Sequence, residues 1–114
     1  MTSLKLALSP DTHAVTVEAT ELDSGLLVYE LPENVDTNYD TRFYRWRIGH
    51  HGGQAIAIAD TEIQAIRGAV AIADVTDWRA DTTTVRAALA ALSQKDREAM
   101  RARLRGRRCY PAGY

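Results

Sequence analysis

The period of the hydrophobic pattern changes once along the chain, and this change restricts the fold more than any other feature. In the first half, apolar residues alternate with other residues, as in Leu4, Leu6 and Leu8. A period of two is typical of β-strands. From Thr61 onwards, apolar residues recur every three or four positions, which is typical of helices. The chain therefore predicts strands first and helices afterwards, the order of an α+β fold.

Five candidate strands occupy the first half, separated by turn-forming residues. Their near-neighbour order predicts an antiparallel meander. In the first hairpin, a loop over Pro10–His13 places Leu8 opposite Val15 and Leu6 opposite Val17, so the apolar faces agree. The strands are expected at residues 4–8, 15–19, 26–31, 42–49 and 54–59.

Three candidate helices follow, expected at Thr61–Ala73, Thr83–Leu92 and Gln94–Arg105. The first and third begin with capping-box spacings, Thr61 to Gln64 and Ser93 to Asp96. The apolar stripe expected to pack the first helix on the sheet consists of Ile63, Ile66, Val70 and Ala73, widened by Ile72. The pattern thus predicts an antiparallel sheet of four or five strands with one helix on its apolar face. We expect one domain over residues 1–105 and a flexible basic tail over residues 106–114.

Composition places the chain among ordinary globular proteins. It has 114 residues, of which 46% are hydrophobic and 25% charged. No apolar run approaches the roughly 20 residues of a membrane helix, and the N-terminal residues lack the pattern of a signal peptide. The single cysteine, Cys109, cannot form an internal disulfide. We therefore expect a cytoplasmic protein.

Charge is distributed very unevenly along the chain. The segment 95–114 carries seven basic and two acidic residues, a net charge of +5. Because the whole chain has a net charge of −1, residues 1–94 carry −6. An acidic body with a cationic end is typical of a protein that binds a partner through that end.

Two adjacent histidines, His50 and His51, suggest a metal or acid–base site, but the hairpin pattern favours a turn. A three-residue loop over residues 51–53 lets Trp46 and Ile48 share a face with Ile58 and Ile56. The loop glycines supply the left-handed backbone position. His50 then ends the core-facing row, and His51 lies at the tip. A metal- or histidine-dependent enzyme remains the least favoured of three functions.

A second candidate surface lies on the predicted fourth strand. Phe43, Arg45 and Arg47 share the sheet face for which the sequence offers no covering helix. Aromatic and arginine side chains on a sheet suit single-stranded nucleic acid, and arginines nearby can add phosphate contacts. The C-terminal arginines complete the candidate binding set, which is Arg97, Arg101, Arg103, Arg105, Arg107 and Arg108.

The sequence lacks the usual motifs for nucleotide binding, serine hydrolysis and dithiol redox chemistry, so we expect no cofactor and no enzyme. The segment Ala88–Leu104 resembles the first half of the helix-turn-helix region of sigma factors, without the recognition helix that should follow. The leading hypothesis is a small interaction or regulatory protein, of the size of phage or mobile-element regulators and inhibitors. Its expected partner is an acidic protein surface, including that of a second copy. Nucleic-acid binding through the same residues is the alternative.

Overall fold

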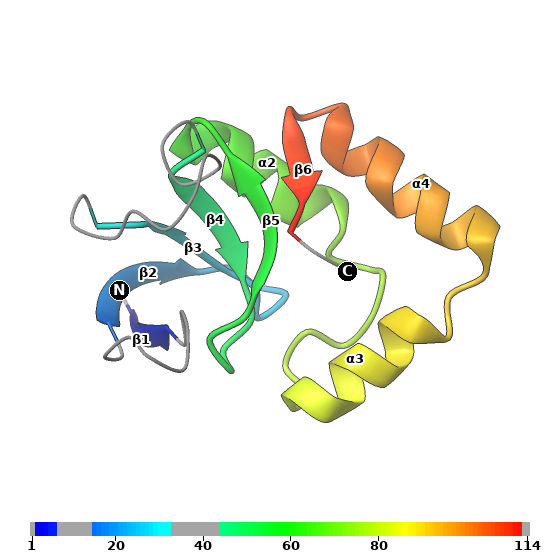
Figure 1. Ribbon diagram of the computed structural model, residues 1–114, viewed down its shortest axis with the longest axis horizontal. Coiled ribbons are helices and arrows are strands. Elements are labelled where there is room, and N and C mark those ends of the chain that lie inside the picture. The colour runs from blue at the N-terminus through cyan, green and yellow to red at the C-terminus, as the bar shows by residue number, and fades with distance from the viewer. Residues whose placement is uncertain (1, 7–14, 33–43, 113–114) are drawn as a thin grey trace.

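The strands and the helices form separate layers, as the change of period predicts. The computed structural model describes residues 2–6, 15–32 and 44–112. Six antiparallel strands follow chain order across one sheet, and helix α2 packs on one of its faces (Figure 1). The strands are β1 (Thr2–Leu6), β2 (Val15–Glu21), β3 (Leu27–Glu30), β4 (Trp46–Gly49), β5 (Ala55–Ala59) and β6 (Cys109–Pro111). The helices are α2 (Glu62–Ala71), α3 (Thr82–Ala90) and α4 (Gln94–Arg105).

The sixth strand comes from the segment that we expected to be a flexible tail. Cys109 pairs with Ala59 and Tyr110 with Ile58, so β6 extends the sheet beyond β5. The segment expected to be a flexible tail therefore contains a strand at residues 109–111, and four to five strands was an undercount. The sequence Cys-Tyr-Pro is too short to show a period. Its pairing depends instead on the free edge that β5 offers, where a proline is tolerated.

The first hairpin forms in a register two residues away from the expected one. Leu4 pairs with Val17, and Leu6 pairs with Val15. Because the shift is even, the side-chain faces are those that the sequence predicts. The proposed loop itself, Pro10–His13, lies outside the described residues.

Both faces of the central strand β3 are covered. On one face, strands β3 to β6 pack against the three helices in a helix-side core (Leu26, Val28, Ile48, Ile56, Ala57, Ala59, Ala65, Ala69, Ile72, Trp78, Val85, Met100, Leu104 and Cys109). On the other, β1 and β2 contribute to a hairpin-side core (Leu4, Val17, Ala19, Leu27, Tyr29 and Leu31). The expectation of one uncovered sheet face therefore does not hold at β3, because a β-hairpin rather than a helix covers it.

The β4–β5 hairpin confirms the expected loop but not the expected pairing beyond it. The His50 N–H donates to the Gln54 carbonyl at 2.8 Å, which closes a loop over residues 51–53. Gly53 has the expected left-handed backbone, with φ 95°. A β-bulge then shifts the register, so Ile48 pairs with Ala57 and Trp46 with Ala59. Ile56 is the extra residue, and it still reaches the helix-side core.

Helix α2 faces the sheet with different residues from those expected. Its buried residues are Ala65, Gly68 and Ala69, whereas Ile63 and Val70 are 61% and 64% exposed. Small residues on the buried face allow the helix axis to approach the sheet closely. The expected stripe was wrong for Ile63 and Val70, because it was chosen by the hydrophobicity of the side chains alone. The distance between the helix axis and the sheet was not considered.

The helix starts follow the capping signals in the sequence. The Thr61 hydroxyl accepts from the Gln64 N–H at 3.2 Å, and the Ser93 hydroxyl accepts from the Asp96 N–H at 3.1 Å. For α3 the cap is Asp81 rather than one of the threonines at 82–84. Its carboxylate accepts from the Thr84 N–H at 2.7 Å. Each cap satisfies a backbone N–H that has no partner within its helix.

Candidate functional site

Helix α4 positions the most strongly charged part of the described chain. It buries only Met100 and Leu104, one turn apart, so the remainder of its surface is open to charged side chains. Five arginines and no acidic residue occur between positions 101 and 108. We call these residues the arginine cluster (Arg101, Arg103, Arg105, Arg107 and Arg108).

The last three members of the arginine cluster lie between two buried anchors. Leu104 and Cys109, on either side of the final turn, are both fully buried in the helix-side core. Within that turn the Arg107 N–H donates to the Leu104 carbonyl, and the Arg108 N–H donates to the Arg105 carbonyl, both at 3.0 Å. The turn therefore presents its arginines from a fixed backbone. In Figure 1 it joins the end of α4 to β6 at one end of the molecule.

The backbone of Arg108 is left-handed, with φ 58°, which a residue with a side chain adopts at a cost of about 1–2 kcal/mol. This conformation reverses the chain from α4 into β6. Glycine would be the favoured residue at such a position. The chain has arginine there instead, so the position retains a charge at the expense of local stability.

The cationic side chains divide into structural and exposed ones. Arg103 forms an ion pair with Asp74 at 2.8 Å, and Arg97 donates to the Ala90 carbonyl at the end of α3 at 3.4 Å. Arg101 is partly buried and engaged in an interaction of its own. The side chains of Arg105, Arg107 and Arg108 are exposed and make no ion pair within the described part of the chain. These three are the members of the arginine cluster that are available to a partner.

The strand surface proposed from Phe43, Arg45 and Arg47 is not an open basic face. Arg47 is only 8% exposed. Arg45 is partly buried, and its guanidinium donates to the carbonyls of Leu31 and Pro32, at 2.8 Å for Leu31. Phe43 lies outside the described residues. The sequence shows that Arg45 and Arg47 share one side of a strand, but it does not show the contacts that bury them there.

Arg47 lies beside Tyr29 in the middle of the sheet, where the two residues pair across β3 and β4. Burial raises the pKa of Tyr29 to about 12, and the charge of Arg47 offsets part of this rise. The tyrosine therefore stays neutral at physiological pH. Arg47 and Tyr29 form part of the packed interior rather than of a binding surface.

The two histidines fasten the β4–β5 hairpin to the segment before α3. His50 is buried, with 1% exposed, and its Nε2 lies 2.7 Å from the Ala80 carbonyl oxygen. His51 is exposed, and its Nε2 lies 2.8 Å from the same oxygen. The ring centroids are 4.0 Å apart. The expectation of a hairpin tip is met, but no pattern in the sequence indicates this long-range contact.

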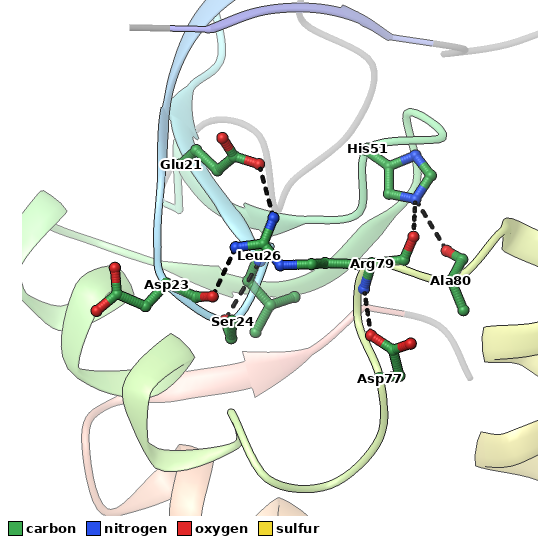
Figure 2. Close-up of polar contacts among 8 residues, drawn as sticks. All are labelled: Glu21, Asp23, Ser24, Leu26, His51, Asp77, Arg79 and Ala80. Carbon is green, nitrogen blue, oxygen red and sulfur yellow. Dashed lines mark hydrogen bonds and ion pairs between the residues drawn. The ribbon is translucent and has the colours of Figure 1, made fainter.

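Arg79 joins the same segment to the turn between β2 and β3. Figure 2 shows its guanidinium between Asp23 of that turn and Glu21 at the end of β2: it donates to the Asp23 carbonyl at 2.7 Å and pairs with Glu21 at 3.6 Å. The Arg79 N–H also donates to the Asp77 carboxylate at 3.1 Å. Residues 77–80, which include the fully buried Trp78, therefore contact both the β2–β3 turn and the β4–β5 hairpin.

A groove of 380 Å³ lies elsewhere, between β2, β3, β4 and the start of α2. Three of the residues that line it are glutamates (Glu18, Glu30 and Glu62), and Trp46 forms part of its wall. In the described residues, no group of three or more histidine, cysteine or acidic side chains could hold a metal ion. The groove and the arginine cluster give one molecule an acidic and a basic surface.

Cys109 carries the thiol of the chain, and it is fully buried under α2. Burial raises the pKa of this thiol to about 11, although a hydrogen bond from the Gly68 backbone lowers it in part. The Sγ atom also contacts the Gln64 carbonyl oxygen at 3.1 Å. Little thiolate exists at neutral pH under these conditions, so this cysteine acts in packing rather than as a nucleophile.

No family model, curated protein sequence or solved structure matches this chain. None of the helices in the described ranges has the length and apolar character needed to span a bilayer.

Proposed function

We propose that this protein is a non-enzymatic interaction module that binds an acidic surface on a partner protein through its arginine cluster. The observation that carries the proposal is the fixed backbone of residues 105–108, anchored by Leu104 and Cys109 and bearing three exposed arginines without ion-pair partners in the described chain. A preorganised turn loses little conformational entropy on binding. Arginine is also among the residues most enriched at the energetic centres of protein interfaces.

An acidic protein is favoured over nucleic acid by the charge of the remaining molecule. Residues 1–94 carry a net charge of −6, which repels a long polyanion that extends beyond the arginine cluster. A compact acidic patch on a protein can contact the cluster alone. The strand surface expected to bind nucleic acid does not provide free arginines, since Arg47 is buried and Arg45 binds backbone carbonyls.

The protein itself carries one acidic surface of this kind. The groove lined by Glu18, Glu30 and Glu62 lies on β2, β3 and α2, away from the end of α4 (Figure 1). A second copy is therefore the first partner to test. Sedimentation velocity at low and high salt measures this directly, since a contact between exposed charges weakens as salt screens it.

The test of the proposal compares two variants that lose the same charge. Arg105→Gln with Arg107→Gln removes two cations from the cluster, and Lys5→Gln with Arg67→Gln removes two exposed cations elsewhere. A poly-L-glutamate peptide short enough to contact the arginine cluster alone is the acidic probe, and fluorescence anisotropy measures its affinity. We expect the cluster variant to bind roughly tenfold more weakly, a change of about 1.4 kcal/mol, and the control variant to bind as the wild type does.

Equal binding by wild type and the cluster variant would contradict the proposal. Single- and double-stranded DNA and RNA oligonucleotides are tested in the same assay. If they bind more tightly than poly-L-glutamate, with a steep loss of affinity as salt increases, then the alternative function of nucleic-acid binding is correct.

A further inference from the structure

The tip of the β4–β5 hairpin contacts the beginning of α3 at several consecutive positions. Both histidine rings reach the Ala80 carbonyl oxygen, one residue before the helix cap. Gly52 packs so closely against the Thr82 hydroxyl that a Cβ atom would collide with it. These contacts join the hairpin tip to the residues before and at the start of α3, outside the strand pairing of the sheet.

A second polar link extends the contact into α3. The Gln54 side-chain oxygen accepts from the Arg86 guanidinium when the amide is oriented to satisfy both groups, with 3.2 Å to Nε. Val85 is the one residue of α3 that is buried. Leu89 of the same helix is partly buried against the helix-side core. With this limited apolar burial, the polar links add to what holds α3 in position.

The hydrogen bonds of His50 require one particular protonation state. Its Nδ1 accepts from the Gly52 N–H at 3.0 Å, so this nitrogen cannot carry a hydrogen. Its Nε2 must then carry the hydrogen and donate to the Ala80 carbonyl. A second proton on the ring would enter at Nδ1, where it faces the Gly52 N–H. Protonation therefore breaks the Gly52 contact and places a charge on a ring that is 1% exposed.

We propose that His50, His51 and the Ala80 carbonyl form an acid-sensitive latch, which holds the start of α3 on the hairpin and releases it when His50 is protonated. The latch is independent of the proposed binding function. His50 is the sensor because both of its ring nitrogens are engaged. His51 donates to the same carbonyl with its Nε2 and is exposed, so a proton on its other nitrogen needs no contact to break.

The charged groups around His50 act in opposite directions. Burial lowers its pKa below 6.5, and the nearby His51 acts in the same direction. The hydrogen bond to Ala80 and the negative charge of Asp81 oppose this change without reversing it. On the connecting segment, the guanidinium of Arg79 is directed to Glu21 and Asp23, while Arg86 of α3 is held by Gln54. The neutral ring is therefore the form that the latched structure prefers.

The lowered pKa of His50 determines whether the latch weakens or strengthens as pH falls. Since the latched form holds His50 below its ordinary pKa of 6.5, the released form takes up a proton first as pH falls. The latch is fully effective above pH 6.5 and weakens below it, until the latched form is itself protonated. Over that interval the equilibrium for release increases up to about tenfold for each pH unit.

Residue-resolved amide hydrogen exchange from about pH 7.5 to about pH 5 tests the latch in the full-length protein. The reporters are the Val85 amide of α3, bonded to the Asp81 carbonyl, and the Ala65 amide of α2, bonded to the Thr61 carbonyl. After correction for the intrinsic exchange rate, we expect protection at Val85 to fall up to about tenfold per pH unit below 6.5, and protection at Ala65 to stay constant. The Asp81 cap does not interfere, because hydrogen bonds from Thr84 hold the pKa of its carboxyl below 3.8.

Two substitutions separate the sensor from its neighbour. In His50→Gln, protection at Val85 is expected to be low and independent of pH. In His51→Gln, the pH dependence is expected to persist. Should His50→Gln fail to fold, the imidazole signal of His50 in the wild type must titrate together with the loss of protection at Val85. Constant protection at Val85 relative to Ala65, or a pH dependence that vanishes in His51→Gln and persists in His50→Gln, would overturn the proposal.

Discussion

At the scale of single residues, Gly68 decides how closely α2 approaches the sheet. A Cβ atom at this position would lie 2.5 Å from Cys109 Sγ and 3.0 Å from Ile48 Cδ1. Contact at such distances forces the neighbours to move. A glycine therefore suits the close packing of α2, and Cys109, the nearer of these two neighbours, comes from the far end of the described chain.

Gly68→Ala should therefore destabilise the protein, although alanine favours helix by about 1 kcal/mol. Overpacking a core costs about 1–3 kcal/mol, and we expect the balance to lower the free energy of unfolding by roughly 1 kcal/mol. Adding Cys109→Ala removes the closest atom, so the double variant should lose less than the two single losses added together. Urea denaturation of the four proteins measures this coupling. A stabilised Gly68→Ala variant is the result that contradicts the close approach.

At the scale of elements, the sequence predicts type and order well and orientation less well. All three helices and the five expected strands occur, and two of the three caps are the expected residues. The side of α2 that faces the sheet could not be predicted, because Ala65, Gly68 and Ala69 carry no strong apolar signal. The bulge at Ile56 was equally hidden, since its register shift depends on packing across the sheet.

Substitutions on opposite sides of α2 should differ strongly in their effects. Ile63 is 61% exposed, so Ile63→Gln should change the free energy of unfolding by no more than about 0.5 kcal/mol. Ile72 is fully buried just after the helix, so Ile72→Ala should cost about 2–5 kcal/mol. Thermal and urea unfolding measure both. If Ile63→Gln proves as costly as Ile72→Ala, then the helix presents to the core the stripe that the sequence predicted.

At the scale of the whole molecule, the sequence shows that basic residues gather in segment 95–114, but it does not show where the fold places them. The cationic end was expected to be loose, whereas β6 returns the chain to the sheet and fixes the arginines beside it. Of the candidate binding residues, those after Leu104 occupy an exposed site, and Arg47 does not. Both outcomes depend on long-range contacts, of β6 with β5 for the C-terminal arginines and of β4 with β3 for Arg47, and one sequence carries no signal for them.

Removal of β6 should affect the whole fold. A chain ending at Arg108 loses the pairing with β5 and the buried Cys109. With backbone hydrogen bonds worth about 1 kcal/mol each, we expect a loss of roughly 3 kcal/mol in the free energy of unfolding. A chain ending at Ala112 retains β6 and serves as the control, since the Ala112 N–H still donates to the Ile56 carbonyl. Equal midpoints of urea unfolding for the two chains would show that β6 contributes little.

During synthesis, β5 must wait for its partner strand β6, which is translated much later. The edge of β5 is complete long before residues 109–111 leave the ribosome, because all three helices are translated in between. During that interval a strand of alternating alanine and isoleucine presents an unpaired edge, which is the kind of surface that recruits other chains. The last described strand is therefore also the one that ends the period in which the nascent chain is most exposed to aggregation.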